Sequence, residues 1–141
     1  MKKSVLEVGC AIIERKGRLL IAQRHEDDHL GGYWEFPGGK KETGETIEDC
    51  LAREVMEELG VVIKPRRALR EIIHAYPDRD IRLMFWLCDW QDNEPRKIDC
   101  QDFCWILPGE LKNFKFPPAD ADLIEDILLN QGDYFMVVGP E

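Results

Sequence analysis

Three glutamates at helical spacing are the residues of this sequence best suited to chemistry. Glu54, Glu57 and Glu58 stand at positions i, i+3 and i+4, which places three carboxylates on one side of a helix. Like charges at these spacings repel one another, so the group needs a compensating partner. A solvated acidic face is one interpretation, and a bound divalent cation is the other. Because no His or Cys accompanies these carboxylates, the cation would be a hard one, Mg²⁺ or Mn²⁺, rather than zinc.

Two neighbouring features favour the cation. Arg53 on the same helix and Glu45 just before it could pair and hold the preceding loop against the helix. The segment Pro37-Gly38-Gly39 offers backbone that a phosphate or a metal ion can approach closely, because glycine has no Cβ. Together these features predict a site for a phosphate and a metal ion.

The helix that carries the glutamates is expected over residues 46–59. Thr46, with Asp49 three residues later, predicts an N-terminal cap, and Gly60 predicts the end of the helix. A buried stripe of aliphatic residues recurs at every fourth position, namely Ile47, Leu51, Val55 and Leu59. This stripe predicts that the helix packs against the rest of the fold on the face that does not carry the glutamates.

Apolar runs predict the strands that must position this helix. They span residues 5–13, 18–23, 68–75, 81–90 and 103–107, and the first two form a hairpin. Residues 31–39, rich in glycine, are expected to form a loop. A second helix is expected over residues 119–129 after two prolines, with its inward residues being Leu123, Ile127 and Leu128. Because strands and helices do not alternate strictly, we predict an α/β fold with a mixed sheet packed between helices.

Composition limits what the chain can bind. The 141 residues fit one domain over residues 1–141, and 19 Lys and Arg against 28 Asp and Glu give a net charge of −9. This charge argues against duplex nucleic acid and membranes as partners. Five cysteines without C-x-x-C spacing indicate free thiols, and the apolar start is too short for a signal sequence, so a cytoplasmic protein is expected. The sequence does not choose between a monomer and a homodimer, and the apolar residues 134–138 could add a strand, cover the core or meet a partner.

Residues 39–61 resemble the conserved box of the Nudix hydrolase superfamily. The 23-residue box reads G-x5-E-x7-R-E-U-x-E-E-x-G-U, where U is a bulky aliphatic residue, and the chain matches it at every spacing. The matching residues are Gly39, Glu45, Arg53, Glu54, Val55, Glu57, Glu58, Gly60 and Val61. The similarity to MutT-like members continues outside the box, over residues 32–40, 76–79, 85–87 and 116–119. The chain is therefore identified as a member of the MutT-like subgroup.

The resemblance implies a Nudix α/β/α sandwich that hydrolyses nucleoside triphosphates to the monophosphate and pyrophosphate, with Mg²⁺ or Mn²⁺ as cofactor. It implies a set of metal ligands that consists of Glu54, Glu57, Glu58 and the carbonyl of Gly38. Glu54 is also the residue that would orient or deprotonate water, although relatives differ in which glutamate is the base. Lys40 would lie near the phosphates, and Arg53 and Glu45 complete the catalytic group. Phosphoryl transfer needs charge neutralisation and an aligned nucleophile, which such a group supplies.

MutT-like proteins add a carboxylate between the last two strands, and two residues could provide it. Asp99 is the nearest match and is assigned to the metal site, while Asp102 is an equal candidate. An acidic surface loop is the third interpretation of this segment.

Five residues outside the box are expected to bind the nucleotide, namely Arg24, His29, Phe36, Tyr76 and Asp120. Arg24 could clamp a phosphate with two hydrogen bonds, whereas His29 could equally be an exposed loop residue. Phe36 and Tyr76 could face the base or belong to the core. Asp120 departs from the bacterial MutT pattern, which has Asn there, and a carboxylate selects a base edge rich in N–H groups. A helix N-cap is the other interpretation of Asp120.

These residues predict hydrolysis of 8-oxo-dGTP, because 8-oxoguanine presents an N7–H that guanine lacks. A CTP or dCTP (5-methyl-dCTP) pyrophosphohydrolase is the alternative within the enzyme class, since the 4-amino group of cytosine also donates to a carboxylate. A non-catalytic nucleotide-binding Nudix module is the alternative from another class. Such modules usually lose box carboxylates, and this chain keeps them.

Overall fold

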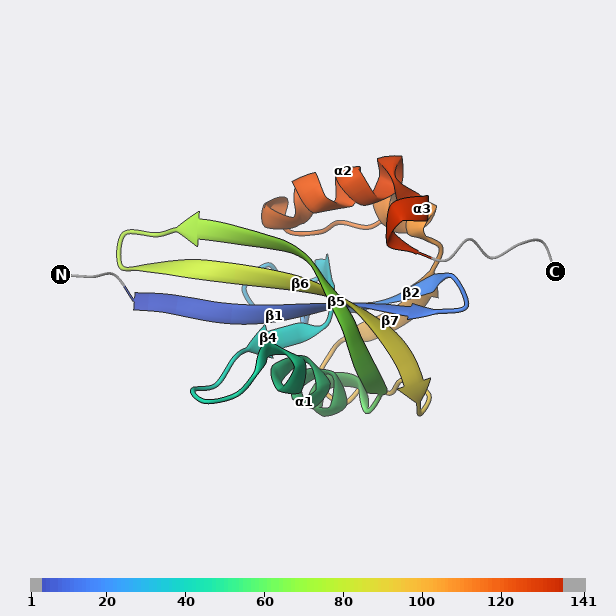
Figure 1. The fold of residues 1–141 in the computed structure, drawn as a ribbon, viewed down its shortest axis with the longest axis horizontal. Coiled ribbons are helices and arrows are strands. Elements are labelled where there is room, and N and C mark those ends of the chain that lie inside the picture. Colours follow the sequence, from blue (N-terminus) through green and yellow to red (C-terminus); the bar gives the residue numbers. More distant parts are fainter. Residues whose placement is uncertain (1–3, 136–141) are drawn as a thin grey trace.

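The computed structural model describes residues 4–135 and contains one mixed sheet with helices on both faces (Figure 1). The central strand β1 (Ser4–Arg15) pairs in parallel with β6 (Arg79–Asp92) along eleven residue pairs. The other pairings of the sheet between described residues are antiparallel. The predicted α/β class, with a mixed sheet between helices, is thus confirmed.

The remaining strands flank this parallel pair. On one side, β2 (Arg18–Gln23) forms the predicted hairpin with β1 and also pairs with β3 (Trp34–Glu35) and β7 (Asp102–Ile106). The short strand β4 (Gly38–Lys40) pairs with β1. On the other side, β5 (Val62–Ala75) pairs with β6 and forms an edge. The expected loop over residues 31–39 therefore contributes two short strands to the sheet.

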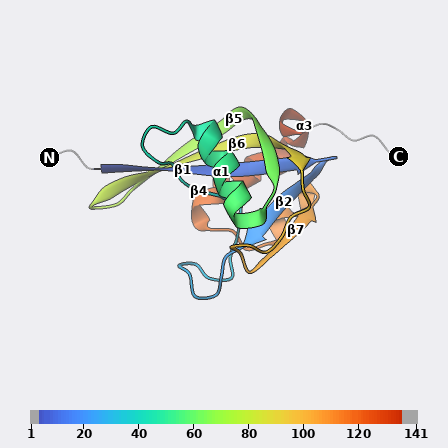
Figure 2. The same cartoon turned by 90° about the horizontal axis from the view of Figure 1, so that it is seen from below.

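Helix α1 (Ile47–Leu59) covers one face of the sheet, as the view from below shows (Figure 2). The Thr46 side chain accepts a hydrogen bond from the Asp49 backbone N–H, and Gly60 ends the helix with a φ of 70°. Both signals were expected from the sequence. The predicted aliphatic stripe packs against the sheet, with Leu51, Val55 and Leu59 fully buried. The expectation that the glutamates lie on the opposite side from this stripe is only partly met, because Glu57 is exposed whereas Glu58 lines the interior cavity.

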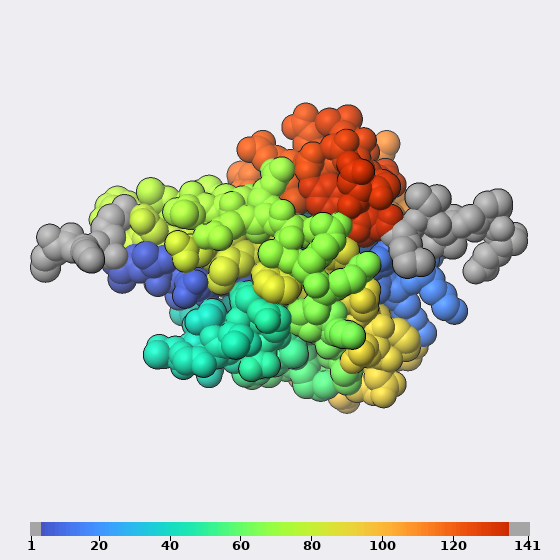
Figure 3. Space-filling view, in the orientation of Figure 1, coloured from blue at the N-terminus to red at the C-terminus, as the bar shows by residue number. Residues whose placement is uncertain are grey.

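The opposite face is covered by the 3₁₀ helix η1 (Pro108–Asn113) and helix α2 (Ala121–Leu129), followed by the short helix α3 (Gln131–Tyr134). Space-filling atoms of α2 and α3 stand above the band of strands, and those of α1 lie below it (Figure 3). Leu123 and Ile127 are fully buried in this layer, and Leu128 packs against it partly buried. Of the apolar tail, Phe135 is buried, and residues 136–138 lie outside the described residues.

The predicted starts of α2 and β5 are among the boundaries that differ from the structure. Helix α2 begins at Ala121 rather than 119, because the 3₁₀ turn η2 (Pro118–Asp120) precedes it. Strand β5 begins at Val62 rather than 68, although it contains Pro65. An edge strand tolerates proline where the ladder is interrupted, and the pairing of β5 shifts register between Pro65 and Arg67.

Two expectations concern the chain as a whole. Within residues 4–135 no helix is both long and apolar enough to cross a membrane. All five cysteines lie in the described range and are free, as their spacing predicted.

Candidate active site

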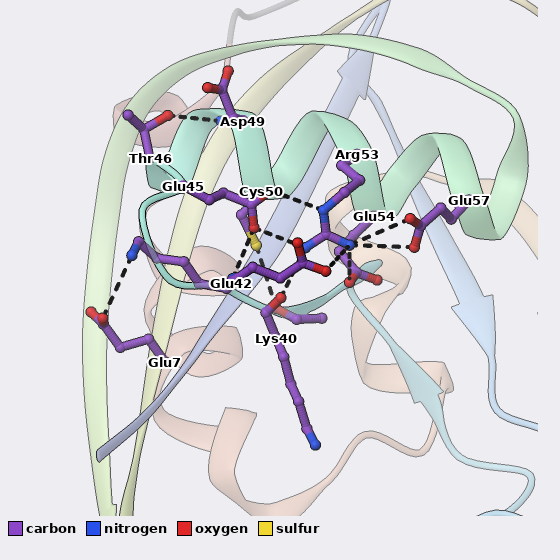
Figure 4. A network of polar contacts seen from close by, with 12 residues as sticks. Glu7, Lys40, Glu42, Glu45, Thr46, Asp49, Cys50, Arg53, Glu54 and Glu57 are labelled. Carbon is purple, nitrogen blue, oxygen red and sulfur yellow. Dashed lines mark hydrogen bonds and ion pairs between the residues drawn. The ribbon is translucent and has the colours of Figure 1, made fainter. Parts of the chain in front are cut away.

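Arg53 is the centre of a network of carboxylates on α1 and in the loop before it (Figure 4). Its Nε and Nη2 donate to the two oxygens of Glu45 at 2.9 and 2.8 Å. Its Nη1 donates to Glu54 Oε1 at 2.8 Å and lies 3.4 Å from the Glu57 carboxylate. Its Nη2 also donates to the Lys40 carbonyl at 3.0 Å. One guanidinium thus neutralises part of the like-charge repulsion that the spacing of the glutamates creates.

Glu45 holds the loop between β4 and α1 against the helix. Besides the bonds from Arg53, its Oε1 accepts a hydrogen bond from the Glu42 backbone N–H at 2.9 Å. The hydrogen bonds from Arg53, then that from Glu42, lower the pKa of Glu45 to about 2. The pairing predicted between Arg53 and Glu45 is therefore present, and it joins residues 42–45 to the helix.

The two glycines of β4 are required by close contacts. A Cβ on Gly38 would lie 1.8 Å from the Gly9 carbonyl oxygen of β1, so no side chain fits there. A Cβ on Gly39 would lie 2.4 Å from a carboxylate oxygen of Glu54. The Glu54 carboxylate therefore lies directly against the backbone of β4.

Glu58 differs from the other two glutamates because it faces the interior. Burial raises its pKa to about 9, and neighbouring negative charges, first that of Glu35, contribute to the rise. A backbone hydrogen bond from Gly38 opposes this effect without cancelling it. Glu57, by contrast, is 58% exposed. The three carboxylates thus occupy three environments, although the sequence places them on one side of the helix.

A cavity of about 340 Å³ opens beside Glu58. Predicted site residues that line it are Arg24, Phe36, Gly38, Glu58, Asp99 and Asp120. The box residue Gly39, against which the Glu54 carboxylate lies, lines it too. One box carboxylate, that of Glu58, and three of the expected nucleotide-binding residues, Arg24, Phe36 and Asp120, therefore line the same cavity.

Asp120 is buried in this cavity with 7% of its surface exposed. It precedes α2, yet its side chain makes no capping hydrogen bond, so the N-cap interpretation does not explain it. Burial, followed by the charge of Glu35, raises the pKa of Asp120 to about 7. A buried carboxyl group without a capping role is available to a ligand in the cavity.

Arg24 lines the cavity but already donates two hydrogen bonds within the protein. Its Nη1 donates to Glu35 Oε2 at 3.0 Å, and its Nε donates to the His29 carbonyl at 2.7 Å. Burial raises the pKa of Glu35 despite the opposing effect of Arg24. Arg24 could bind a phosphate with its remaining N–H groups, while the two bonds fix its orientation.

The two candidates for the additional carboxylate lie in different places. Asp99 lines the cavity, and its backbone N–H donates to the Glu58 carbonyl at 3.0 Å. Its Oδ1 lies 3.3 Å from His25 Nε2. Asp102 is outside the lining of the cavity, and its Oδ1 lies 3.4 Å from Lys97 Nζ. The geometry therefore favours Asp99 over Asp102 for a role beside Glu58.

Seven predicted site residues do not line the cavity. Four of them, Glu45, Arg53, Glu54 and Glu57, form the carboxylate network on α1 and in the loop before it, and the other three are Lys40, His29 and Tyr76. The Lys40 side chain is exposed and points away from the carboxylates, so only its carbonyl joins the network (Figure 4). The His29 side chain is exposed, and only its carbonyl is used, by Arg24. Tyr76 is 47% exposed in the turn between β5 and β6, which projects beyond the helix layers (Figure 3).

Cys10 and Glu35, conversely, line the cavity and were not predicted. Glu35 had a signal in the sequence, because an acidic residue between Trp34 and Phe36 is unusual in an apolar strand. Cys10 had none, since a cysteine in an apolar run is typical of a core strand.

The residues present fit a hard divalent cation. The donors beside the cavity are carboxylate oxygens and the backbone of Gly38, which are the ligand types that Mg²⁺ and Mn²⁺ prefer. Within the described part of the chain, no group of three or more His, Cys, Asp or Glu side chains is already arranged as a metal site. The hydrogen bonds from Arg53 explain this arrangement, because they turn Glu54 and Glu57 toward the guanidinium. To coordinate an ion, Glu54 and Glu57 would have to bind it while keeping their hydrogen bonds from Arg53, or give up those hydrogen bonds.

The fold and the box together define a class of protein. A family model described as a NUDIX domain matches residues 8–126, and the chain therefore belongs to the Nudix family. Members of this family generally use a divalent metal ion. The identification as a MutT-like Nudix hydrolase made from the box is confirmed.

Curated relatives are similar over most of their length. The chain is 41% identical over 95 residues to the 8-oxo-dGTP diphosphatase of Proteus vulgaris, covering 67% of this chain and 85% of the relative. It is 36% identical over 124 residues to the 8-oxo-dGTP diphosphatase of Escherichia coli K12, covering 88% and 95%. It is 34% identical over 121 residues to the CTP pyrophosphohydrolase of E. coli K12, covering 86% and 90%.

Solved structures agree with this assignment. The solution structure of the E. coli ORF135 protein superposes with a TM-score of 0.79 at 32% identity, covering 93% of this chain and 94% of that one. The MutT protein of methicillin-resistant Staphylococcus aureus 252 superposes with a TM-score of 0.73 at 32% identity, covering 92% and 99%. The predicted Nudix sandwich is thus confirmed.

Proposed function

We propose that this protein hydrolyses nucleoside triphosphates to the monophosphate and pyrophosphate, with Mg²⁺ as cofactor and 8-oxo-dGTP as preferred substrate. The observation that carries the proposal is a single cavity lined both by the box residue Glu58 and by the buried Asp120. Relatives that are 41% and 36% identical are 8-oxo-dGTP diphosphatases, which supports the same substrate here. Mn²⁺ offers the same coordination chemistry and is the second candidate cofactor.

In this proposal the box residues prepare the phosphates for attack by water. Glu57, Glu58 and the Gly38 carbonyl would hold the cation, with Glu54 and Asp99 beside them. The cation would neutralise the phosphates and stabilise the leaving pyrophosphate. Hydrolysis forms a bond from a water oxygen to phosphorus, breaks the bridging P–O bond and transfers a water proton to a carboxylate. Glu54 is assigned that proton, since Arg53 and Gly39 fix the position of its carboxylate.

Asp120 would select the base. Above its pKa of about 7 the carboxylate is ionised and accepts a hydrogen bond from N7–H of 8-oxoguanine, whereas N7 of guanine has a lone pair and would repel it. Sites that depend on hydrogen bonds can reject a mismatched analogue by about 10⁴-fold. The aromatic wall beside it supports base binding, because Phe36 packs against Phe85 and Phe116 at centroid distances of 6.2 and 5.1 Å.

Steady-state kinetics on a panel of triphosphates tests the substrate. Pyrophosphate release, measured with a coupled pyrophosphatase, should give the highest kcat/KM with 8-oxo-dGTP and far lower values with dGTP, CTP and dCTP. The Glu57→Gln variant should lose nearly all activity, while Glu48→Gln, an exposed residue of the same helix, should retain it. Equal and negligible rates in the unaltered protein and in Glu57→Gln would instead favour a binding module.

CTP or dCTP hydrolysis is the second candidate function. It is favoured by the similarity to the E. coli CTP pyrophosphohydrolase, and by Asp120, which would accept equally from the 4-amino group of cytosine. If, in the same panel, kcat/KM for CTP or dCTP exceeded that for 8-oxo-dGTP, the cytidine nucleotide would be the preferred substrate.

A further inference from the structure

Cys10 marks the point at which β1 passes from the cavity into the core. Alternate side chains of a strand lie on the same face of the sheet, so Val8, Cys10 and Ile12 point the same way. Val8 and Cys10 line the cavity, whereas Ile12 is fully buried. Cys10 is partly exposed, and it is the last residue of this face of β1 that a molecule in the cavity could touch.

Asp120 gives an independent sign that a ligand occupies this part of the cavity. Its side chain is more than nine-tenths buried and lines the same cavity. Between residues 4 and 135, no side chain or backbone group forms a hydrogen bond or ion pair with its carboxylate. Cys10 lines this cavity too, and after burial the charge of Asp120 is the largest cause of the raised pKa of the Cys10 thiol.

The surroundings of Cys10 have the character of a nucleobase site. Cys10 packs with the cluster that contains Phe36 and Phe85, and both rings also line the cavity. Flat apolar walls beside one polar side chain suit a planar ring with polar edges. The thiol, which is small and weakly polar, lines the cavity together with these rings and Asp120.

We propose that Cys10 forms part of the surface that receives the nucleobase, and that an electrophile attached to its Sγ closes the site. The inference rests on the proposed function only in that the cavity takes the base of a nucleotide. N-Ethylmaleimide provides the test reaction. An S–C bond forms, the C=C double bond of the maleimide becomes single, and the thiol proton passes to the adjacent carbon. No oxidant or reductant is needed.

The other four cysteines provide internal controls. Cys50, Cys88 and Cys100 are buried. Cys104 on β7 is partly exposed like Cys10 and packs against the same cluster, yet it does not line the cavity. It is therefore the control for a partly exposed thiol outside the base site.

The experiment treats the full chain with N-ethylmaleimide, maps the adducts by peptide mass spectrometry and measures residual activity. Labelling of Cys10 should parallel the loss of activity. Adding 8-oxo-dGMP with Mg²⁺ at ten times its dissociation constant should slow labelling of Cys10 by about tenfold and leave that of Cys104 unchanged. The Cys10→Ala variant treated with N-ethylmaleimide should be as active as the same variant left untreated. The Cys104→Ala variant should lose activity on treatment, as the unaltered protein does.

Two results would overturn the inference. One is inactivation of Cys10→Ala at the same rate as the unaltered protein. The other is labelling of Cys10 that 8-oxo-dGMP and CMP both leave unchanged. If 8-oxo-dGTP proves not to be the substrate but CMP slows the labelling, the inference about Cys10 stands and only the choice of base fails.

A larger side chain at position 10 gives a second measurement. Cys10→Leu should raise KM for a purine triphosphate by about tenfold or more and affect a pyrimidine triphosphate less, because the added atoms reduce the space for the larger ring. If each nucleotide had the same KM in the variant as in the unaltered protein, the proposed contact would be contradicted.

Discussion

Arg53 and Glu45 form a two-point contact, Nε to Oε2 at 2.9 Å and Nη2 to Oε1 at 2.8 Å. The same guanidinium reaches Glu54 through Nη1, so the loop before α1 and the assigned base are held by one side chain. In the proposed reaction this relationship gives Arg53 a positioning role, because it fixes the place of the Glu54 carboxylate, to which the water proton is assigned.

Replacing Arg53 with lysine should separate charge from geometry. Lys keeps the positive charge but cannot form the fork that binds both Glu45 oxygens and Glu54. We expect kcat/KM to fall about 10- to 100-fold, as for other residues that orient ligands. Steady-state kinetics checks the activity, and thermal unfolding checks that the fold remains. Arg15→Lys, in an exposed pair with Glu94, is the control and should not change kcat/KM. A full rate in Arg53→Lys would show that charge alone suffices.

The Gly39→Ala substitution should impair the site, although it creates no cavity and changes no charge. The new Cβ would lie 2.4 Å from the Glu54 carboxylate, which must move to make room. A displacement of about 1 Å in a catalytic group can cost about 10²-fold, so kcat should fall by that order. Gly132→Ala is the matched control, since no atom lies within 4 Å of its Cβ position. Similar kcat values for the two variants would refute the close contact between Gly39 and Glu54.

The catalytic helix could be predicted from sequence because its signals are local. The four-residue period, the cap at Thr46 and the stop at Gly60 all lie within α1 or next to it, and each was found in the structure. The box residues follow from the same helix and the loop before it. No contact with a distant strand is needed to recognise them.

The walls of the cavity could not be predicted in the same way. Cys10 and Glu35 come from β1 and β3, and only the pairing of the sheet brings them to Asp120. Tyr76 was expected at the base, but strand pairing sets its place at a turn, where it is exposed. Long-range pairing therefore limits what residue types alone can indicate about base recognition.

Asp99 and Asp102 make a matched pair of variants. Asp99 lines the cavity beside Glu58, whereas Asp102 contacts Lys97 outside it. Asp99→Asn should therefore lower kcat/KM by about 10- to 100-fold and raise the Mg²⁺ concentration needed for half-maximal activity. Asp102→Asn should change neither value more than slightly. If Asp102→Asn had the larger effect in a Mg²⁺ titration of activity, Asp102 rather than Asp99 would be the additional carboxylate.

Asp120 should make stability depend on pH in a predictable direction. Its pKa rises from 3.8 to about 7 on folding, so unfolding releases a proton between these pH values. The folded state binds more protons than the unfolded state there, and stability must fall as the pH rises through this window. Above pH 7 the penalty is complete and constant.

The Asp120→Asn variant isolates this effect, since its amide does not ionise. At pH 8 the variant should exceed the unaltered protein in free energy of unfolding by roughly 2–4 kcal/mol, and the difference should shrink toward zero near pH 4. Urea unfolding at pH 4, 6 and 8 measures it. Asp122→Asn, an exposed residue of α2, is the control and should show a small difference that does not vary with pH. A difference for Asp120→Asn that stays constant from pH 4 to 8 would mean that Asp120 ionises normally in the folded protein. The argument for a carboxyl group buried against the nucleobase would then fail.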